Sequence, residues 1–367
     1  MRIAIVNERV SETDVLRRAI ALMPEHQVIW SAKTGAGAVK LCGRKTPDLV
    51  LMDLFMAGMD GVEATRRIMA SAPCAILIMT GSIHADAARV FEAMGHGALD
   101  AVDMPGLKGR EVLDSASPLL EKISVISRLI GAKNPARRAP ASRVAASGRP
   151  PYPLIAIGAS AGGPAALAEV LSGLPRDFPA AIVVIQHVDA RFAVGMADWL
   201  SRQSVLPVMV AREDERPAAG CVLLAGTRDH LMLKSADRVG YTPEPRDSAC
   251  RPSVDVFFQS IGGLWRGDAI GVLLTGMGSD GALGLKVLRD QGHHTITQDQ
   301  TTSAVYGMPQ AAAALNAAVD ILPIERIASR LTEAVSWHAH HGVSPKTMAQ
   351  IPEAELSQSS ITGAVLR

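Results

Sequence analysis

The sequence has little of several features that mark whole classes of protein. Aromatic residues make up 4% of the 367 residues, and only four cysteines occur, at positions 42, 74, 221 and 250. No C-x-x-C pair and no histidine-rich segment accompanies them, so their spacing predicts neither a disulfide framework nor a zinc site. Because free cysteine is often buried, we expect four buried, reduced thiols.

Net charge and long apolar runs are also nearly absent. Lys and Arg number 37 against 36 Asp and Glu, a formal net charge of +1, so no general field favours nucleic acid. The 48% hydrophobic content excludes a disordered chain. No apolar run approaches the roughly 18 residues that span a bilayer, and residues 1–6 are too short and strand-like for a signal peptide. We expect a soluble, cytoplasmic protein without membrane insertion.

Two domains are expected, since a domain takes roughly 150 residues. In residues 1–130, short apolar runs alternate with segments such as 12–21 and 62–70, whose apolar residues recur three and four apart. This alternation predicts a doubly wound, flavodoxin-like parallel sheet of five strands. The five runs cover residues 3–6, 28–31, 49–53, 75–80 and 99–102.

A change in composition separates this half from the next. Residues 131–152 carry five basic residues and no acid among repeated Ala, Ser and Pro, which predicts a flexible linker. Its charge either is solvated or contacts an acidic surface or a membrane face. A second alternation, with strands at 154–158, 182–186 and 269–274, predicts another doubly wound, mostly parallel α/β domain over 153–338. Residues 339–367 are predicted to be a tail.

Carboxylates lie at the predicted strand ends of the first domain. Asn7 and Glu8 follow its first strand, Asp53 ends the third and Thr80 ends the fourth. Because function gathers at the carboxyl ends of parallel strands, Glu8 and Asp53 could together hold Mg²⁺, and Asp53 could accept a phosphoryl group. The alternative is a set of solvated loop residues.

Residues 49–61, LVLMDLFMAGMDG, resemble the receiver domain of two-component response regulators. That resemblance implies that a histidine kinase phosphorylates Asp53, that Glu8 and Asp53 bind Mg²⁺, and that the Thr80 hydroxyl reorients toward the phosphate. Three positions depart from the receiver pattern. Asn7 replaces one of two usual acids, Ala57 replaces a turn proline, and Met104 replaces a lysine whose cation would help to bind phosphate.

Three polar residues follow strands of the second predicted domain. Ser160 stands at a tight glycine-rich turn between a strand and a helix, which suits a nucleophile, a phosphate-binding loop or a plain structural turn. His187 follows the second strand, where a structural role is the common alternative. Asp280 follows the strand at 269–274. Hydroxyl, imidazole and carboxylate are the three groups of a serine hydrolase.

Their roles follow from their acidities. A serine hydroxyl needs a base with a pKa near neutrality, which His187 supplies, and Asp280 would orient the imidazole and stabilise its cation. The loop around Met277 could donate a backbone N–H to the oxyanion. The chain order Ser, His, Asp disfavours the α/β-hydrolase superfamily, where the acid precedes the histidine.

Five motifs in order resemble the catalytic domain of the chemotaxis methylesterase CheB. They are IGASAGGP at 157–164, VIQH at 184–187, RPSVD at 251–255, LTGMGSDG at 274–281 and QDQTTSAVYGMP at 298–309. The resemblance implies hydrolysis of glutamate methyl esters on methyl-accepting chemoreceptors with release of methanol, and deamidation of receptor glutamines. It assigns Ser160 as nucleophile, His187 as base, Asp280 as orienting acid and Met277 as backbone oxyanion donor, with no catalytic cofactor.

Asn7 and Met104 in the receiver half look like the branch typified by WspF, which would link the pathway to cyclic-di-GMP. The receiver is expected to block the catalytic crevice until Asp53 is phosphorylated. Ala161 replaces a common Thr and Cys250 a common His. Arg251, Ser253 and Asp255 are expected to stabilise a loop, with a substrate role as the alternative. A serine esterase for small esters and a non-catalytic phosphate sink or receptor-binding regulator remain as alternatives.

Overall fold

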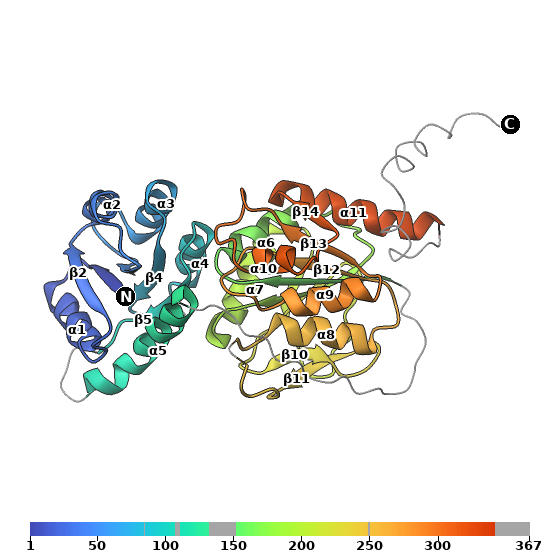
Figure 1. Ribbon diagram of the computed structural model, residues 1–367, viewed down its shortest axis with the longest axis horizontal. Coiled ribbons are helices and arrows are strands. Elements are labelled where there is room, and N and C mark those ends of the chain that lie inside the picture. Colours follow the sequence, from blue (N-terminus) through green and yellow to red (C-terminus); the bar gives the residue numbers. More distant parts are fainter. Residues whose placement is uncertain (84, 107–110, 132–151, 249, 342–367) are drawn as a thin grey trace.

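The computed structural model describes residues 1–83, 85–106, 111–131, 152–248 and 250–341, which form two α/β domains (Figure 1). Residues 132–151 of the predicted linker and 342–367 of the predicted tail lie outside the described residues. The helix that ends the second domain continues to His341, three residues beyond the end predicted for that domain.

The first domain contains a five-stranded parallel sheet in the order β2-β1-β3-β4-β5, which confirms the predicted doubly wound receiver fold. The inner strands β1, β3 and β4 consist almost wholly of buried aliphatic residues because helices cover both faces, whereas most residues of the edge strand β2 are half-buried or exposed. Ile5 and Leu51 pack with helices α1 and α5 on one face, whereas Val6 and Met52 pack with α2 to α4 on the other. The elements are β1 (Arg2–Val6), α1 (Val10–Ile20), β2 (Gln27–Ala32), α2 (Gly35–Arg44), β3 (Leu49–Asp53), α3 (Gly61–Ser71), β4 (Ala75–Thr80), α4 (Ala87–Gly95), β5 (Asp100–Asp103) and α5 (Glu111–Gly131).

The second domain contains a seven-stranded parallel sheet in the order β14-β13-β12-β6-β7-β9-β8, again doubly wound as predicted. Its strands are β6 (Leu154–Ala159), β7 (Ala181–Gln186), β8 (Val208–Val210), β9 (Val222–Leu224), β12 (Ala269–Leu273), β13 (His294–Gln298) and β14 (Asp320–Leu322). A separate antiparallel hairpin joins β10 (His230–Leu233) to β11 (Val239–Thr242).

Helices cover both faces of this second sheet. Ile155 and Ile157 of β6 belong to the cluster on the side of α6, α7 and α11, whereas Leu154 and Ala156 face α8, α9 and α10. This alternation follows from the two-residue period of a strand. The helices are α6 (Gly163–Ser172), α7 (Ala193–Gln203), α8 (Val254–Leu264), α9 (Ala282–Asp290), α10 (Met308–Ala314) and α11 (Ile324–His341), and a 3₁₀ turn, η1 (Ala190–Phe192), precedes α7.

The strand order creates a crevice at the centre of the second sheet. β6 lies between β7 and β12, so the chain leaves β6 toward one side of the sheet and later returns to the other. Such a reversal opens a crevice at the carboxyl ends of the strands, where ligands of α/β proteins bind. The loops that carry Ser160, His187 and Asp280 follow these three strands.

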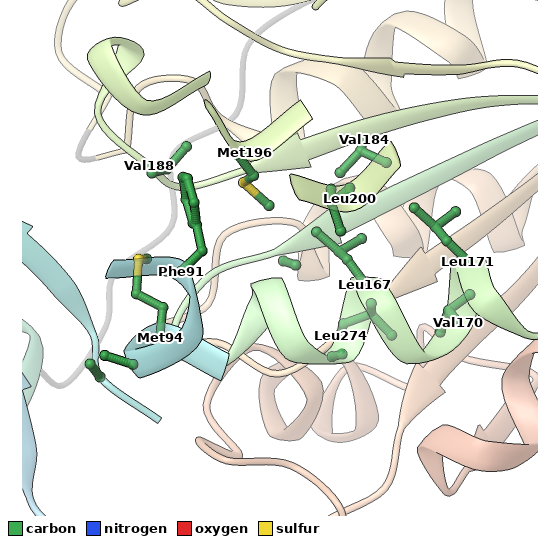
Figure 2. Packing of buried hydrophobic residues seen from close by; sticks show 14 of the residues in the cluster. Phe91, Met94, Leu167, Val170, Leu171, Val184, Val188, Met196, Leu200 and Leu274 are labelled. Atoms are coloured by element: carbon green, nitrogen blue, oxygen red, sulfur yellow. The ribbon is translucent and has the colours of Figure 1, made fainter. Parts of the chain in front are cut away.

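A single hydrophobic cluster joins the two domains (Figure 2). Phe91 and Met94 of α4 are buried against α6 and α7 of the second domain. The Phe91 ring meets Phe192 edge-on at a centroid distance of 6.1 Å and stacks on Trp199 at 6.2 Å. An ion pair of 3.4 Å between Arg191 and Asp103 lies beside this contact.

Cysteine burial differs from the expectation. All four thiols are free, and Cys42 is buried, but Cys74, Cys221 and Cys250 are only half-buried. Cys74 and Cys221 lie at strand starts and Cys250 in the loop before α8, where less chain covers them than in a sheet interior. The expectation of four buried thiols is therefore wrong for three. None of the helices in the described part of the chain is long and apolar enough to cross a membrane.

Candidate active site

Ser160 lies at the turn between β6 and α6. Its amide donates to the carbonyl of Thr275 (3.0 Å), and its own carbonyl accepts from the amide of Gly163 (2.8 Å). Gly162 has a φ of 75°, which a residue with a Cβ adopts only with strain. A Cβ at Gly163 would overlap the side chain of Gln186. The glycines that followed Ser160 in the sequence motif are thus required by this turn.

His187 and Asp280 form the central hydrogen bond of the site. Nε2 of His187 lies 2.8 Å from Oδ2 of Asp280, and their side chains are 14% and 11% exposed. A carboxylate only accepts, so Nε2 carries the hydrogen and Nδ1 of His187 is left as the basic nitrogen. The residues come from the loops after β7 and β12, 93 positions apart.

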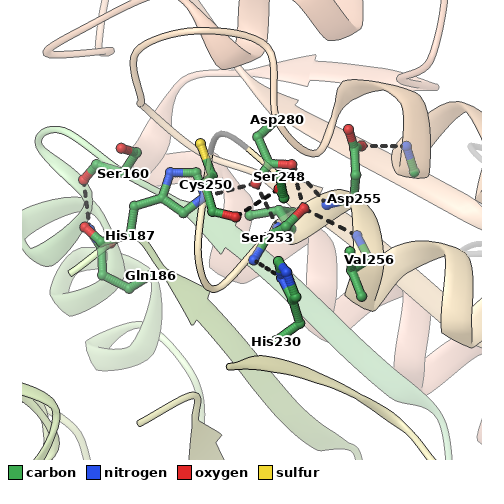
Figure 3. A network of polar contacts seen from close by, with 12 residues as sticks. Ser160, Gln186, His187, His230, Ser248, Cys250, Ser253, Asp255, Val256 and Asp280 are labelled. Atoms are coloured by element: carbon green, nitrogen blue, oxygen red, sulfur yellow. Dashed lines mark hydrogen bonds and ion pairs between the residues drawn. The ribbon is translucent and has the colours of Figure 1, made fainter. Parts of the chain in front are cut away.

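Asp280 is held as an anion by a ring of donors (Figure 3). Burial alone would raise its pKa, but hydrogen bonds from His187, the Ser253 hydroxyl (2.7 Å) and the Val254 amide (2.7 Å) hold the pKa below its usual value. Ser253 also caps α8, whose first amides face the carboxylate. The 251–255 motif thus stabilises the loop that carries Asp280, as expected, and it does so from the start of a helix at Val254 that was not predicted.

Ser160 and His187 lie side by side, and Gln186 links their backbones. The buried side chain of Gln186 donates from Nε2 to the carbonyls of Ser160 (2.8 Å) and His187 (3.2 Å). No hydrogen bond joins the Ser160 hydroxyl to the imidazole among the described residues. In enzymes without substrate such a contact is often long and tightens on binding.

Met277 presents a free backbone donor to the same space. Within the part of the chain that the structure describes, its amide donates to no protein acceptor. Its loop is fixed because the carbonyl of Gly276 accepts from Gly307 (3.0 Å) and Met308 (2.8 Å). A preorganised, unpaired N–H is what an oxyanion needs.

A cavity of about 640 Å³ contains these groups and lies partly under the first domain. Ser160, Ala161, His187, Cys250 and Met277 line its floor. Residues of the receiver line the other side, mostly from α5, namely Leu99, Asp100, Pro118, Glu121, Lys122 and Ile126. Both domains therefore line the cavity that contains Ser160.

The receiver site is built at the end of β3. Burial raises the pKa of Asp53 to about 6, partly offset by the Phe55 amide that donates to Oδ1 at 3.2 Å. Glu8 is exposed and accepts from the amide of Ala57 (3.1 Å). The side chain of Asn7 donates to Glu12 (3.0 Å), a buried acid that the sequence analysis passed over.

These residues fit a hard cation. Asp53 is a half-buried carboxylate that forms no ion pair with a basic side chain in the described residues, and Glu8 lies on the loop opposite. Oxygen ligands and room for water are what Mg²⁺ requires. The carbonyl oxygen of the Asn7 side chain accepts from the Arg9 amide (2.8 Å), so its position is fixed within this loop.

Two contacts connect the receiver site to α4. The Thr80 hydroxyl donates to Asp86, the residue that precedes α4. Arg89 of α4 forms an ion pair with Asp60 and lies over the ring of Phe55, 5.6 Å from its centroid. Asp60 and Phe55 both lie in the loop that follows Asp53, so Arg89 connects α4 to the receiver site. The spacing of these residues in the sequence does not predict this contact.

Cys250 also belongs to the catalytic site. Burial and the charges of Asp280 and Asp255 raise the pKa of its thiol to about 12, so the thiol is neutral. No sequence motif places Cys250 beside His187, because only tertiary structure brings the 250 loop to the end of β7.

Comparisons with known proteins agree with this geometry. Residues 155–331 match the CheB methylesterase family, and residues 3–110 match the response regulator receiver domain. The chain is 58% identical over 333 residues to protein-glutamate methylesterase/protein-glutamine glutaminase 1 of Pseudomonas fluorescens (strain Pf0-1), which covers 91% of this chain and 99% of that protein. It is 56% identical over 338 residues to the protein-glutamate methylesterase/protein-glutamine glutaminase of Mesorhizobium japonicum, with 91% and 98% covered.

Among solved structures, the catalytic domain of Thermotoga maritima CheB methylesterase is similar to this chain. The sequence identity is 32% and the TM-score is 0.48, over 51% of this chain and 99% of that one.

Proposed function

The chain belongs to the CheB methylesterase family, and from this premise we propose that Ser160, His187 and Asp280 hydrolyse glutamate methyl esters on a methyl-accepting chemoreceptor. It is a protein-glutamate methylesterase with an amino-terminal receiver domain. The observation that supports the residue assignment is the 2.8 Å bond between His187 and the buried anion of Asp280, beside Ser160 and the free amide of Met277.

The first half of the reaction forms an acyl-enzyme. Oγ of Ser160 attacks the ester carbonyl while Nδ1 of His187 takes its proton, and Asp280 stabilises the imidazolium through Nε2. The oxyanion of the tetrahedral intermediate accepts from the amide of Met277. When the intermediate collapses, the C–O bond to the methoxy group breaks and His187 returns the proton, so methanol leaves.

The second half restores the enzyme. Water attacks the γ-glutamyl ester of Ser160, His187 takes its proton, and the Ser160 oxygen leaves as the hydroxyl with that proton. The product is a glutamate carboxylate. The same residues deamidate a receptor glutamine if ammonia replaces methanol as the leaving group.

Methanol release from a methylated receptor fragment by the purified full-length protein tests this assignment. We expect release by the native chain and a loss of at least about 10³-fold in Ser160→Ala, since removing the nucleophile leaves only binding and oxyanion effects. Free small esters serve as a comparison. Hydrolysis of small esters without receptor hydrolysis would support the small-ester alternative, and no hydrolysis of either would support the non-catalytic regulator.

Phosphorylation of Asp53 is the second part of the proposal. A chemotaxis-type histidine kinase is the proposed donor, and Glu8 and Asp53 are the proposed Mg²⁺ ligands. Bound Mg²⁺ supplies charge neutralisation for the incoming phosphoryl group. Because receiver residues line the cavity over Ser160, phosphorylation should open the approach to it. Assignment to the WspF branch rests on Asn7 and Met104 and stays a prediction.

Removing residues 1–150 tests the gate. We expect the truncated protein to release methanol several-fold faster than the unphosphorylated full chain. A truncated protein that is no faster would contradict autoinhibition by the receiver while leaving the esterase assignment intact.

A further inference from the structure

Cys250 completes a group of three metal-binding side chains in the catalytic site. Ligand atoms of His187, Cys250 and Asp280 all lie within 4.8 Å of one another. Among the described residues this is the one group of three His, Cys, Asp or Glu side chains so arranged. The hydrolytic mechanism uses two of the three, and it gives the thiol no role.

The chemistry of this set points to zinc. An imidazole nitrogen, a thiolate and a carboxylate are all ligands of Zn²⁺, and three protein ligands with an open fourth position are typical of accessible zinc sites. The thiolate selects against Mg²⁺ and Ca²⁺, which prefer oxygen. The cavity beside Ser160 and Met277 leaves the fourth position accessible to water.

The geometry requires only small movements. Zn²⁺ binds nitrogen and oxygen at about 2.0–2.2 Å and sulfur at about 2.3 Å, so tetrahedral ligand atoms lie roughly 3.3–3.6 Å apart. Nε2 of His187 and Oδ2 of Asp280, now 2.8 Å apart, must separate slightly, and the thiol must approach. Cys250 lies in the loop between β11 and α8, outside any helix or strand, so its side chain can move without disturbing the sheet.

We propose that His187, Cys250 and Asp280 form an inhibitory Zn²⁺ site. The ion binds Nε2 of His187 between this nitrogen and Asp280, the Nε2 hydrogen moves to Nδ1, and the Cys250 thiolate completes the ligand set with release of the thiol proton to solvent. The imidazole then holds a cation and no longer serves as base for Ser160. The inhibitory effect rests on the proposed function, whereas the binding site does not.

Metal binding is tested first, without any activity. Co²⁺ added to the full-length protein should give the near-ultraviolet charge-transfer absorption of a cobalt–thiolate bond, and Zn²⁺ should displace it. Cys250→Ser should lose this absorption, and Cys221→Ser should keep it because Cys221 is also half-buried but lies outside the group. Equal absorption in Cys250→Ser and the native chain, or none in either, would overturn the proposal.

Inhibition is then measured as methanol release against free Zn²⁺, with each variant normalised to its own metal-free rate. The native enzyme should be inhibited and should recover with a chelator, and Cys250→Ser should need at least about tenfold more Zn²⁺. Equal sensitivity of the two would overturn inhibition through this site. If the native chain released no methanol at all, the proposed function would fail while the cobalt absorption still decided the metal site.

Discussion

Two carboxylates of this protein show how surroundings decide the charge of a single residue. Asp280 is nearly enclosed but receives hydrogen bonds from His187, Ser253 and Val254, so its pKa stays below the usual value. Asp53 is less buried, yet among the described residues it accepts from one amide and forms no ion pair, so burial raises its pKa to about 6. For the pKa of these two carboxylates, the number of hydrogen-bond donors matters more than the depth of burial.

Asp280→Asn should reduce kcat by about 10³- to 10⁴-fold with little change in KM. The amide keeps the shape of the side chain but presents the wrong hydrogen-bonding group to His187 and cannot stabilise the imidazolium. Methanol release over a range of receptor concentrations separates the two constants. Ser253→Ala is the matched control, since it removes one of several donors and should cost far less. Similar losses in both variants would contradict the role of Asp280.

Mg²⁺ should bind the receiver more weakly as the pH falls through about 6. The ion binds the ionised form of Asp53, so below that pKa protons compete and the apparent affinity should drop about tenfold per pH unit. Calorimetric titration with Mg²⁺ between pH 5 and 8 checks this, with Asp53→Asn as the non-binding control. An affinity that stays constant down to pH 5 would mean that the pKa of Asp53 is not raised.

At the scale of helices and strands, apolar runs predicted the strands that lead to the site, whereas strands that are short, or polar like β13 (His294–Gln298), were missed. The strands that carry Asp53, Thr80, Ser160 and His187 are runs of buried aliphatic residues, and these were predicted within a residue or so. β8, β9 and β14 have three residues each, too few for a period. The start of α8 at Val254, which Ser253 caps, was not predicted, and the contact of Ser253 with Asp280 depends on packing across 27 positions.

The α4 helix should carry the phosphorylation signal through Arg89. Its guanidinium joins α4 to the loop after Asp53. Position 104 is Met, so the lysine that would bind the phosphate in other receivers is not there to transmit the change. Arg89→Gln should reduce the stimulation of methanol release by a small phosphodonor while phosphorylation of Asp53 persists. The effect on stability should stay below about 1 kcal/mol, as for exposed ion pairs.

Arg66→Gln is the control for Arg89, because Arg66 forms an exposed ion pair with Glu63 on α3, a helix outside the domain contact. Phosphodonor stimulation should be unchanged in this variant. If both variants responded like the native chain, the signal would have to pass by another contact, such as that between Thr80 and Asp86.

At the scale of the whole molecule, the contact between the domains is an ordinary hydrophobic core. Phe91 is fully buried between the receiver and the rings of Phe192 and Trp199. A small change in the position of α4 therefore changes the packing energy of the contact, and a phosphate can open the enzyme by as much as it favours the open state.

Phe91→Ala should raise the methanol release of the unphosphorylated enzyme several-fold. Truncating a buried Phe costs about 3–5 kcal/mol of packing, which weakens the closed arrangement. Val194→Ala, an exposed position at the start of α7, should leave the rate unchanged. An unaltered basal rate in Phe91→Ala would show that this contact does not hold the receiver over the cavity.

The hydrophobic cluster that joins the domains has a consequence for how the protein unfolds. Melting of either domain alone would expose the rings of Phe91, Phe192 and Trp199 to water, so each domain raises the melting temperature of the other. The unphosphorylated chain should therefore give one cooperative calorimetric transition, and an open form should give two. The number of transitions in a calorimetric scan therefore reports whether the receiver is packed against the catalytic domain.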